Sequence, residues 1–243
     1  MSPTPPAMDL DPARRAVFAQ ELRDALAAQC PGSVTALRGS LARGTADPYS
    51  DIDLAWTVPD AQFEACVAAV GPCLGAVRAV VSLRSDPDSQ RDSQRPCSRK
   101  LLFLAFRDMP LFWRLDLEIL AVSDGSAGPS GPVGPVGPVG AGLGGGRAQE
   151  DGGPEAVGDP EWSLAASALA NAVAVVKVVL RGQPEVAVGL LERGLRRIGA
   201  GGSASGRWRA DVVRLASAAA EHEPAQRPLA DQVKRLAAEL LEG

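Results

Sequence analysis

Residues 37–54 read LRGSLARGTADPYSDIDL, and this stretch is the most informative part of the chain for its fold and its function. It predicts the end of a strand, a Gly-Ser turn that opens a short helical segment, a proline-containing turn and a second strand. Successive side chains of a strand point to opposite faces, so Asp51 and Asp53 share one face about 6.6 Å apart. Ile52 and Leu54 then point to the opposite face, toward a core. Two carboxylates in this relation can converge on a pair of divalent cations.

Gly39-Ser40, a loop and then Asp51-Ile52-Asp53 resemble the signature of the polymerase-beta-type nucleotidyltransferase superfamily. The stretch is similar in particular to the kanamycin (aminoglycoside) nucleotidyltransferase group and its minimal relatives. The resemblance implies an enzyme that transfers a nucleoside monophosphate, with AMP expected, from a nucleoside triphosphate to a hydroxyl group. It also implies two Mg²⁺ ions as cofactors and ATP as the expected co-substrate.

Four residues of this stretch are candidates for binding the nucleotide. Gly39 lacks a Cβ atom, so a phosphate can approach the backbone closely. Ser40 lies where a helix begins, and its hydroxyl and the exposed N–H groups suit a terminal phosphate. Gly-Ser alone is a common turn dipeptide, and its register with the two aspartates gives it meaning. Arg43 and Ser50 lie in the same loop as candidates for phosphate or metal contacts, with a plain surface cation as the equal alternative for Arg43.

Three carboxylates are the predicted metal ligands and catalytic residues. Asp is depleted in strands, so Asp51 and Asp53 in one short strand favour metal ligation over a solvated strand face. The resemblance implies a third carboxylate on a later strand flanked by apolar residues, and Asp116 between two leucines fits. Asp116 would then bind the catalytic metal and help to deprotonate the acceptor hydroxyl. Glu118 shares its face of the strand and is the alternative.

Lys177 is the only charged residue within the apolar segment 162–180. Its side chain either extends along the helix edge to solvent or contacts the triphosphate, as a lysine from the second domain often does in the family. We favour the second reading, because the sequence from Lys177 to Gly182 resembles that local pattern. In the kanamycin group a carboxylate one turn earlier serves as the catalytic base, and here that position is Val173. Either Asp116 takes this role or the acceptor differs from an aminoglycoside.

The pattern of the whole chain predicts an α+β fold: an N-terminal polymerase-beta-like mixed sheet with flanking helices, followed by a C-terminal four-helix bundle. In the first part we expect helices at 11–28 and 60–69 and strands at 34–38, 51–58, 76–83, 100–106 and 112–122. Residues 124–160 contain four Gly-Pro-x triplets and many further glycines, which indicates a flexible linker. Helices are expected at 161–181, 185–198, 207–221 and 229–241. The predicted domains are therefore a catalytic domain at 10–123, the linker, and an all-helical domain at 161–243.

The composition limits the partners and the compartment. A net charge of −4 and a pI near 5.2 predict no general attraction to nucleic acid. Four cysteines without CxxC spacing and a single histidine, His222, argue against a structural zinc site. The N-terminus lacks the pattern of a signal peptide and no segment suits a membrane span, so we expect a cytoplasmic protein with no membrane partner. A homodimer is a further hypothesis, because related enzymes can complete their sites across a dimer.

Three functions compete at this point. The first is Mg²⁺-dependent nucleotidyl transfer to a small-molecule hydroxyl, possible acceptors including aminoglycoside-like antibiotics. The second is a protein- or RNA-modifying minimal nucleotidyltransferase of the toxin–antitoxin type. The third is a degenerate nucleotide-binding module without turnover, against which the retained carboxylates and Gly-Ser argue. Exchange of both strand aspartates for asparagine separates an enzyme from a binding module, since only the enzyme would lose an activity.

Overall fold

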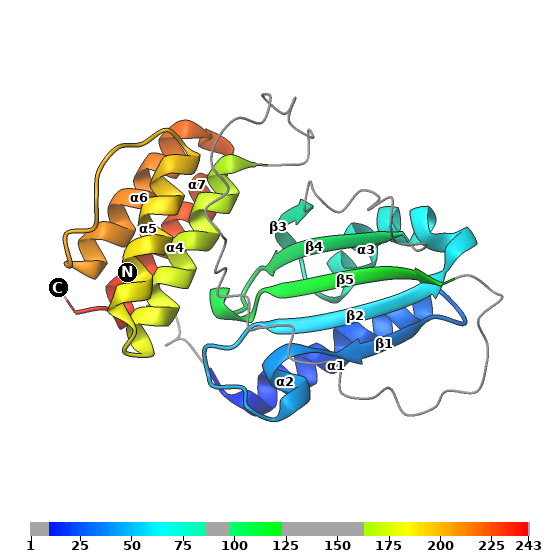
Figure 1. The fold of residues 1–243 in the computed structure, drawn as a ribbon. Coiled ribbons are helices and arrows are strands. Elements are labelled where there is room, and N and C mark those ends of the chain that lie inside the picture. Colours follow the sequence, from blue (N-terminus) through cyan, green and yellow to red (C-terminus); the bar gives the residue numbers. More distant parts are fainter. Residues whose placement is uncertain (1–9, 86–97, 123–162, 243) are drawn as a thin grey trace, which may run out of the picture.

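The computed structural model describes residues 10–85, 98–122 and 163–242 and has the predicted α+β architecture (Figure 1). A five-stranded mixed sheet with helices comes first, and four packed helices follow. The linker predicted at 124–160 lies outside the described residues, and the domain boundaries stay a prediction. Among the described helices, none combines the length and the hydropathy that crossing a membrane requires.

The sheet part and the helical region, α4–α7, follow one another along the chain. The sheet part consists of α1 (Pro12–Gln29), β1 (Val34–Leu37), α2 (Gly39–Arg43), β2 (Ile52–Pro59), η1 (Asp60–Gln62), α3 (Phe63–Val77), β3 (Val80–Ser85), β4 (Arg99–Phe106), η3 (Leu111–Trp113) and β5 (Leu115–Val122). The helical region consists of α4 (Leu164–Leu180), α5 (Pro184–Arg197), α6 (Trp208–His222), η4 (Pro224–Gln226) and α7 (Arg227–Leu240).

The sheet has the strand order β1-β2-β5-β4-β3, in which β2 and β5 form the parallel pair. The register of that pair places Asp53 directly opposite Asp116. The antiparallel neighbours extend the row, with Phe103 opposite Asp116 and Arg84 opposite Phe103. Direct partners share a face of the sheet. A row of one arginine, one aromatic ring and two carboxylates therefore crosses four strands on a single face.

The opposite face of the sheet carries the core, against which α1 and α3 pack (Figure 1). Ile52 and Leu54 of β2 are buried there, as the alternation of the strand predicts. The start of α1 is also as predicted: Asp11 caps the helix by accepting a hydrogen bond from the Ala13 N–H, and Pro12 occupies the first turn. One face thus stabilises the fold and leaves the other for polar residues.

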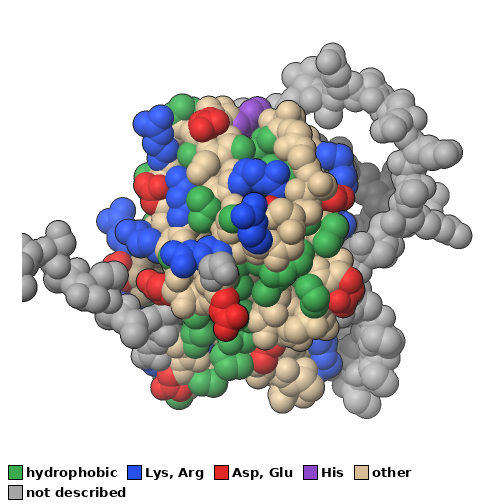
Figure 2. Space-filling model, turned by 90° about the vertical axis from the view of Figure 1, so that its left-hand side faces the viewer, with side chains coloured by type: hydrophobic (Ala, Val, Ile, Leu, Met, Phe, Trp, Pro, Cys, Tyr) green, Lys and Arg blue, Asp and Glu red, His purple; other side chains and the backbone are tan. Residues whose placement is uncertain are grey.

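The helical region is organised around α4, which packs against α5, α6 and α7. It lies beside the end of the sheet at which β2 and β5 begin, with α4 nearest to the strands (Figure 1). Close packing inside it depends on Gly194 of α5, where an added Cβ would lie 2.7 Å from Leu215 Cδ2. His222 is exposed at the end of α6 and is visible at the surface in Figure 2.

Three predicted boundaries are wrong. The helix expected at 60–69 continues to Val77, so the strand expected from residue 76 begins only at Val80. Pro72 lies inside this helix, at a cost of about 3 kcal/mol, but Leu74 and its apolar neighbours on the same face are fully buried, and each contributes about 1.5–3 kcal/mol. The strand expected from Phe112 begins at Leu115, because Pro110 is followed by the 3-10 turn η3.

Candidate active site

A cleft of about 930 Å³ lies between the sheet part and the helices α4 and α5. Every residue predicted to act in the site lines it, although the residues come from α2, the loop before β2, β2 itself, β5 and α4. These residues are Gly39, Ser40, Arg43, Ser50, Asp51, Asp53, Asp116 and Lys177. Folding therefore brings the candidates together, whereas the alternative residue Glu118 pairs with Arg99 and Arg38 and does not line the cleft.

Asp53 fits against the backbone of α2 because residue 39 is a glycine. Gly39 has a φ of +56°, in the left-handed region, and an added Cβ would overlap Asp53 Oδ2 and lie 2.7 Å from Asp53 Cγ. The Arg38 N–H donates a 2.8 Å hydrogen bond to the Asp53 carbonyl and fixes the two segments together. Gly39 thus makes room for the Asp53 carboxylate. The sequence had predicted only that a phosphate could approach the backbone at this residue.

Two cations hold Asp51. Lys177 Nζ lies 3.0 Å from Asp51 Oδ2, and Arg114 Nη2 lies 3.8 Å from the same oxygen. Burial alone would raise the pKa of Asp51, but the charges of Lys177 and Arg114 outweigh it and lower that pKa. The Lys177 side chain is only 14% exposed, so its ammonium points into the cleft instead of extending to solvent.

Arg114 grips Asp116 with two hydrogen bonds, Nε to Oδ1 at 2.6 Å and Nη2 to Oδ2 at 2.8 Å. Its guanidinium also lies 5.2 Å from the ring centroid of Phe103, the cross-strand partner of Asp116. Burial would lower the pKa of Arg114, but the charge and hydrogen bonds of Asp116 raise it above its ordinary value. Arg114 was not predicted as a site residue, although its i, i+2 spacing from Asp116 was the available signal.

Asp53 is the carboxylate of the three with which neither Lys177 nor Arg114 forms an ion pair, although it lies close to the other two. Burial, then the charges of Asp51 and Asp116, raise the pKa of Asp53 to about 6. Among the described residues its side chain is in no ion pair. A cation between the three aspartates would relieve this repulsion.

The donor set suits Mg²⁺, which binds carboxylate oxygens. As the side chains stand, however, no three Asp, Glu, His or Cys residues of the described segments are arranged to hold one ion. Arg114 contacts both carboxylate oxygens of Asp116, and Lys177 contacts Oδ2 of Asp51. The residues therefore fit a metal site once these two cations release their partners.

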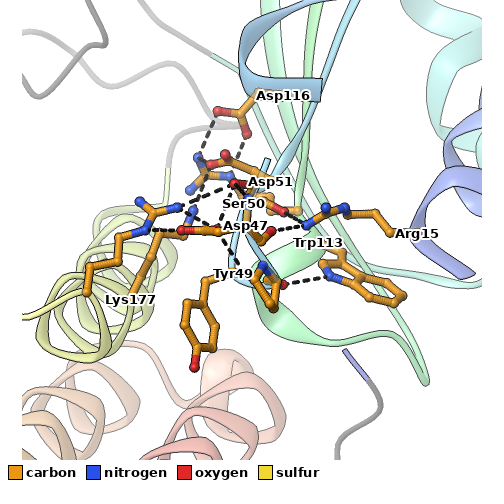
Figure 3. A network of polar contacts seen from close by, with 11 residues as sticks. Arg15, Asp47, Tyr49, Ser50, Asp51, Trp113, Asp116 and Lys177 are labelled. Atoms are coloured by element: carbon orange, nitrogen blue, oxygen red, sulfur yellow. Dashed lines mark hydrogen bonds and ion pairs between the residues drawn. The ribbon is translucent and has the colours of Figure 1, made fainter. Parts of the chain in front are cut away.

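The loop before β2 is held by Arg15 of α1, which lies beside it (Figure 3). Arg15 is 2% exposed and donates to the carbonyls of Asp47 and Ser50, the latter at 3.1 Å. Trp113 Nε1 donates to the Pro48 carbonyl at 3.3 Å from the same side of the loop (Figure 3). Arg15 lies far from the loop in sequence, so nothing in the local pattern indicated this contact.

The same loop is tied to the helical region through Asp47. Arg181, the residue that follows α4, donates to both carboxylate oxygens of Asp47, at 2.7 and 2.9 Å. The Ser50 hydroxyl donates to Asp47 Oδ1 at 2.8 Å, so its proton is used within the loop. The hydrogen bonds from Arg181, and then that from Ser50, lower the pKa of Asp47 to about 2. The position of Arg181 one helical turn after Lys177 was the signal that could have identified it.

Residues 19–92 match the family model described as "Nucleotidyltransferase domain". The match includes Gly39, Ser40, Asp51 and Asp53 and ends before Asp116 and the helical region. No curated protein and no solved structure matches the chain. A place within the kanamycin group therefore stays a prediction.

Proposed function

We propose that the nucleotidyltransferase domain at residues 19–92, completed by β5 and α4, transfers a nucleoside monophosphate from a nucleoside triphosphate to a hydroxyl group of a small molecule. ATP is the expected donor. The observation that carries the proposal is the convergence of Asp51, Asp53 and Asp116 with Gly39-Ser40 and Lys177 on one cleft.

In this reaction the acceptor oxygen bonds to the α-phosphorus while the bond from that phosphorus to the bridging oxygen breaks, and pyrophosphate leaves. Asp51, Asp53 and Asp116 would hold two Mg²⁺ ions, which supply charge neutralisation of the triphosphate. Asp116 accepts the proton of the hydroxyl, since no carboxylate stands at Val173 of α4.

The triphosphate needs contacts of its own. Gly39 and Ser40 present backbone and hydroxyl groups at the start of α2, and Arg43 follows on the same short helix. Lys177 becomes available for phosphate oxygens when Asp51 turns to a metal ion, and Arg114 is freed in the same way from Asp116. The two ion pairs of the cleft thus keep Lys177 and Arg114 close to the place where the triphosphate would bind.

The test is calorimetric titration with α,β-methylene-ATP, once with Mg²⁺ and once with EDTA. We expect binding that requires Mg²⁺ and is lost in Asp51→Asn, while Asp231→Asn on the exposed side of α7 serves as the control and binds as the parent does. Binding that is equal in EDTA would indicate a nucleotide-binding module without metal chemistry. No binding of the ATP, GTP, CTP or UTP analogues would refute the proposed function.

A further inference from the structure

The wall of the cleft that α4 and α5 provide differs in charge from the sheet side. Its charged residues are Lys177, Arg181 and Arg193, and its remaining surface is apolar, with Val173, Val186 and Leu190 among its side chains. Within the described residues, no Asp or Glu of α4–α7 lines the cleft. All the acidic residues of the cleft come from the sheet part.

Two of the three cations on this wall are paired. Lys177 contacts Asp51, and Arg181 contacts Asp47. Arg193 of α5 is exposed and in no ion pair among the described residues. Its charge also contributes, after burial, to lowering the pKa of Arg197 on the next turn, so the two arginines reinforce one another's positive potential. The α5 side of the cleft therefore carries uncompensated positive charge.

Figure 2 shows the outer surface of the helical region, on which basic side chains cluster in the upper half with hydrophobic side chains below them. This outer surface faces away from the sheet, so the basic character of the cleft wall itself rests on Lys177, Arg181 and Arg193. These three cations of the wall attract an anion and repel a polycation.

Space for a ligand exists beside these residues. Gly189 lines the cleft from α5, and an added Cβ there would meet no atom within 4 Å. Val186 and Leu190 flank it on the same helix and offer an apolar surface. The wall therefore combines an apolar surface at Val186 and Leu190 with the guanidinium of Arg193. Such a combination is suited to binding an anion with an apolar body.

We propose that this wall is the acceptor subsite and that the acceptor is an anionic hydroxyl compound with an apolar body, not a polycationic aminoglycoside. The inference rests on the proposed function, because it assigns the second substrate of the same cleft. Arg193 binds the anionic group, Val186 and Leu190 pack against the apolar body, and the hydroxyl faces the carboxylates of the sheet side. Val173 of α4 lines this wall as well and adds apolar surface to it.

The experiment measures the affinity of the full chain for 8-anilinonaphthalene-1-sulfonate, an anionic apolar probe, by fluorescence titration. The chain is first saturated with Mg²⁺ and α,β-methylene-ATP. Kanamycin is the polycationic probe, titrated by calorimetry. We expect Arg193→Glu to weaken binding of the sulfonate about tenfold or more and Gly189→Phe about fivefold or more. Their matched controls, Arg196→Glu on the outer face of α5 and Gly75→Phe on α3, should stay within about twofold of the parent.

Two results would overturn the inference: tighter binding of kanamycin than of the sulfonate, or equal loss of the sulfonate in Arg193→Glu and Arg196→Glu. Arg193→Gln, which removes the charge and introduces none, provides the same comparison if the glutamate variant does not fold. Failure of the proposed function has a different outcome, since the nucleotide analogue would then fail to bind with Mg²⁺ before either acceptor probe is added.

Discussion

The contact between Gly39 and Asp53 yields the sharpest prediction, because the chain contains a matched control. Gly39 and Gly44 are at the two ends of α2 and have similar left-handed backbones, with φ of +56° and +67°. An added Cβ at Gly39 overlaps the Asp53 carboxylate, whereas at Gly44 it meets nothing within 4 Å. Gly39→Ala and Gly44→Ala therefore impose the same backbone strain, and only the first displaces Asp53.

The shared part of the effect can be estimated from the backbone. A left-handed conformation costs an L-residue about 1–2 kcal/mol. In a chain of this size about 1 kcal/mol lowers the melting temperature by about 2–4 °C, so both variants should melt about 2–8 °C below the parent. The part specific to Gly39→Ala is the shift of Asp53, which should weaken Mg²⁺-dependent nucleotide binding about tenfold or more, or about 1.4 kcal/mol.

Thermal unfolding followed by circular dichroism measures the first quantity, and calorimetric titration with Mg²⁺ and α,β-methylene-ATP measures the second. Gly44→Ala should keep nucleotide affinity within about twofold of the parent. Equal loss of affinity in the two variants would show that the strain of α2, and not the position of Asp53, controls binding. Unchanged affinity in Gly39→Ala would remove Asp53 from the site.

Three further substitutions test charges in and below the cleft. Arg15→Met leaves two loop carbonyls without their donor and should lower the free energy of unfolding by about 1–3 kcal/mol, read from urea denaturation, and an unchanged midpoint would contradict the buried contact. Without Mg²⁺, Asp53 binds its proton more tightly in the folded chain than in the unfolded chain, so the free energy of unfolding should fall as the pH rises from 3.8 to about 6. In thermal scans at several pH values, Asp53→Asn should lack this decrease. Lys177→Met should weaken Mg²⁺-dependent nucleotide binding about tenfold, whereas Lys234→Met on α7 should not, and parity between the two lysines would exclude Lys177 from the triphosphate site.

Local pattern was enough to place the candidate carboxylates Asp53 and Asp116 on their strands, although Asp116 was selected through the family resemblance. The alternation of apolar and acidic residues around Asp53 and Asp116 places both on the polar face of their strands, and only the parallel pairing of β2 with β5 had to be supplied by the fold. A turn at Gly39-Ser40 was likewise expected from the dipeptide, and the structure adds its left-handed φ of +56°. These features depend on backbone geometry over a few residues, which the sequence encodes directly.

Lys177 was predicted, but the arginines that hold the site and its loop were not. The pair of Arg181 with Asp47 joins residues 134 positions apart, and Arg15 reaches the loop from the first helix. No periodicity records such contacts, because they arise from how the helical region and α1 pack on the sheet. The length of α3 was missed for a related reason, since burial of Leu74 overrides the helix-stopping signal of Pro72.

The pairs of Lys177 with Asp51 and of Arg181 with Asp47 lie one turn apart on α4, and together they fasten this helix to the loop before β2. Any ligand that takes Asp51 from Lys177 also removes one of the two fasteners. By thermodynamic linkage, a firmer attachment of α4 to the loop must lower the affinity for such a ligand. Binding of the ligand must weaken the attachment of α4 by an equal free energy. The strength of substrate capture in this protein is thus set partly by how tightly its two halves hold one another at rest.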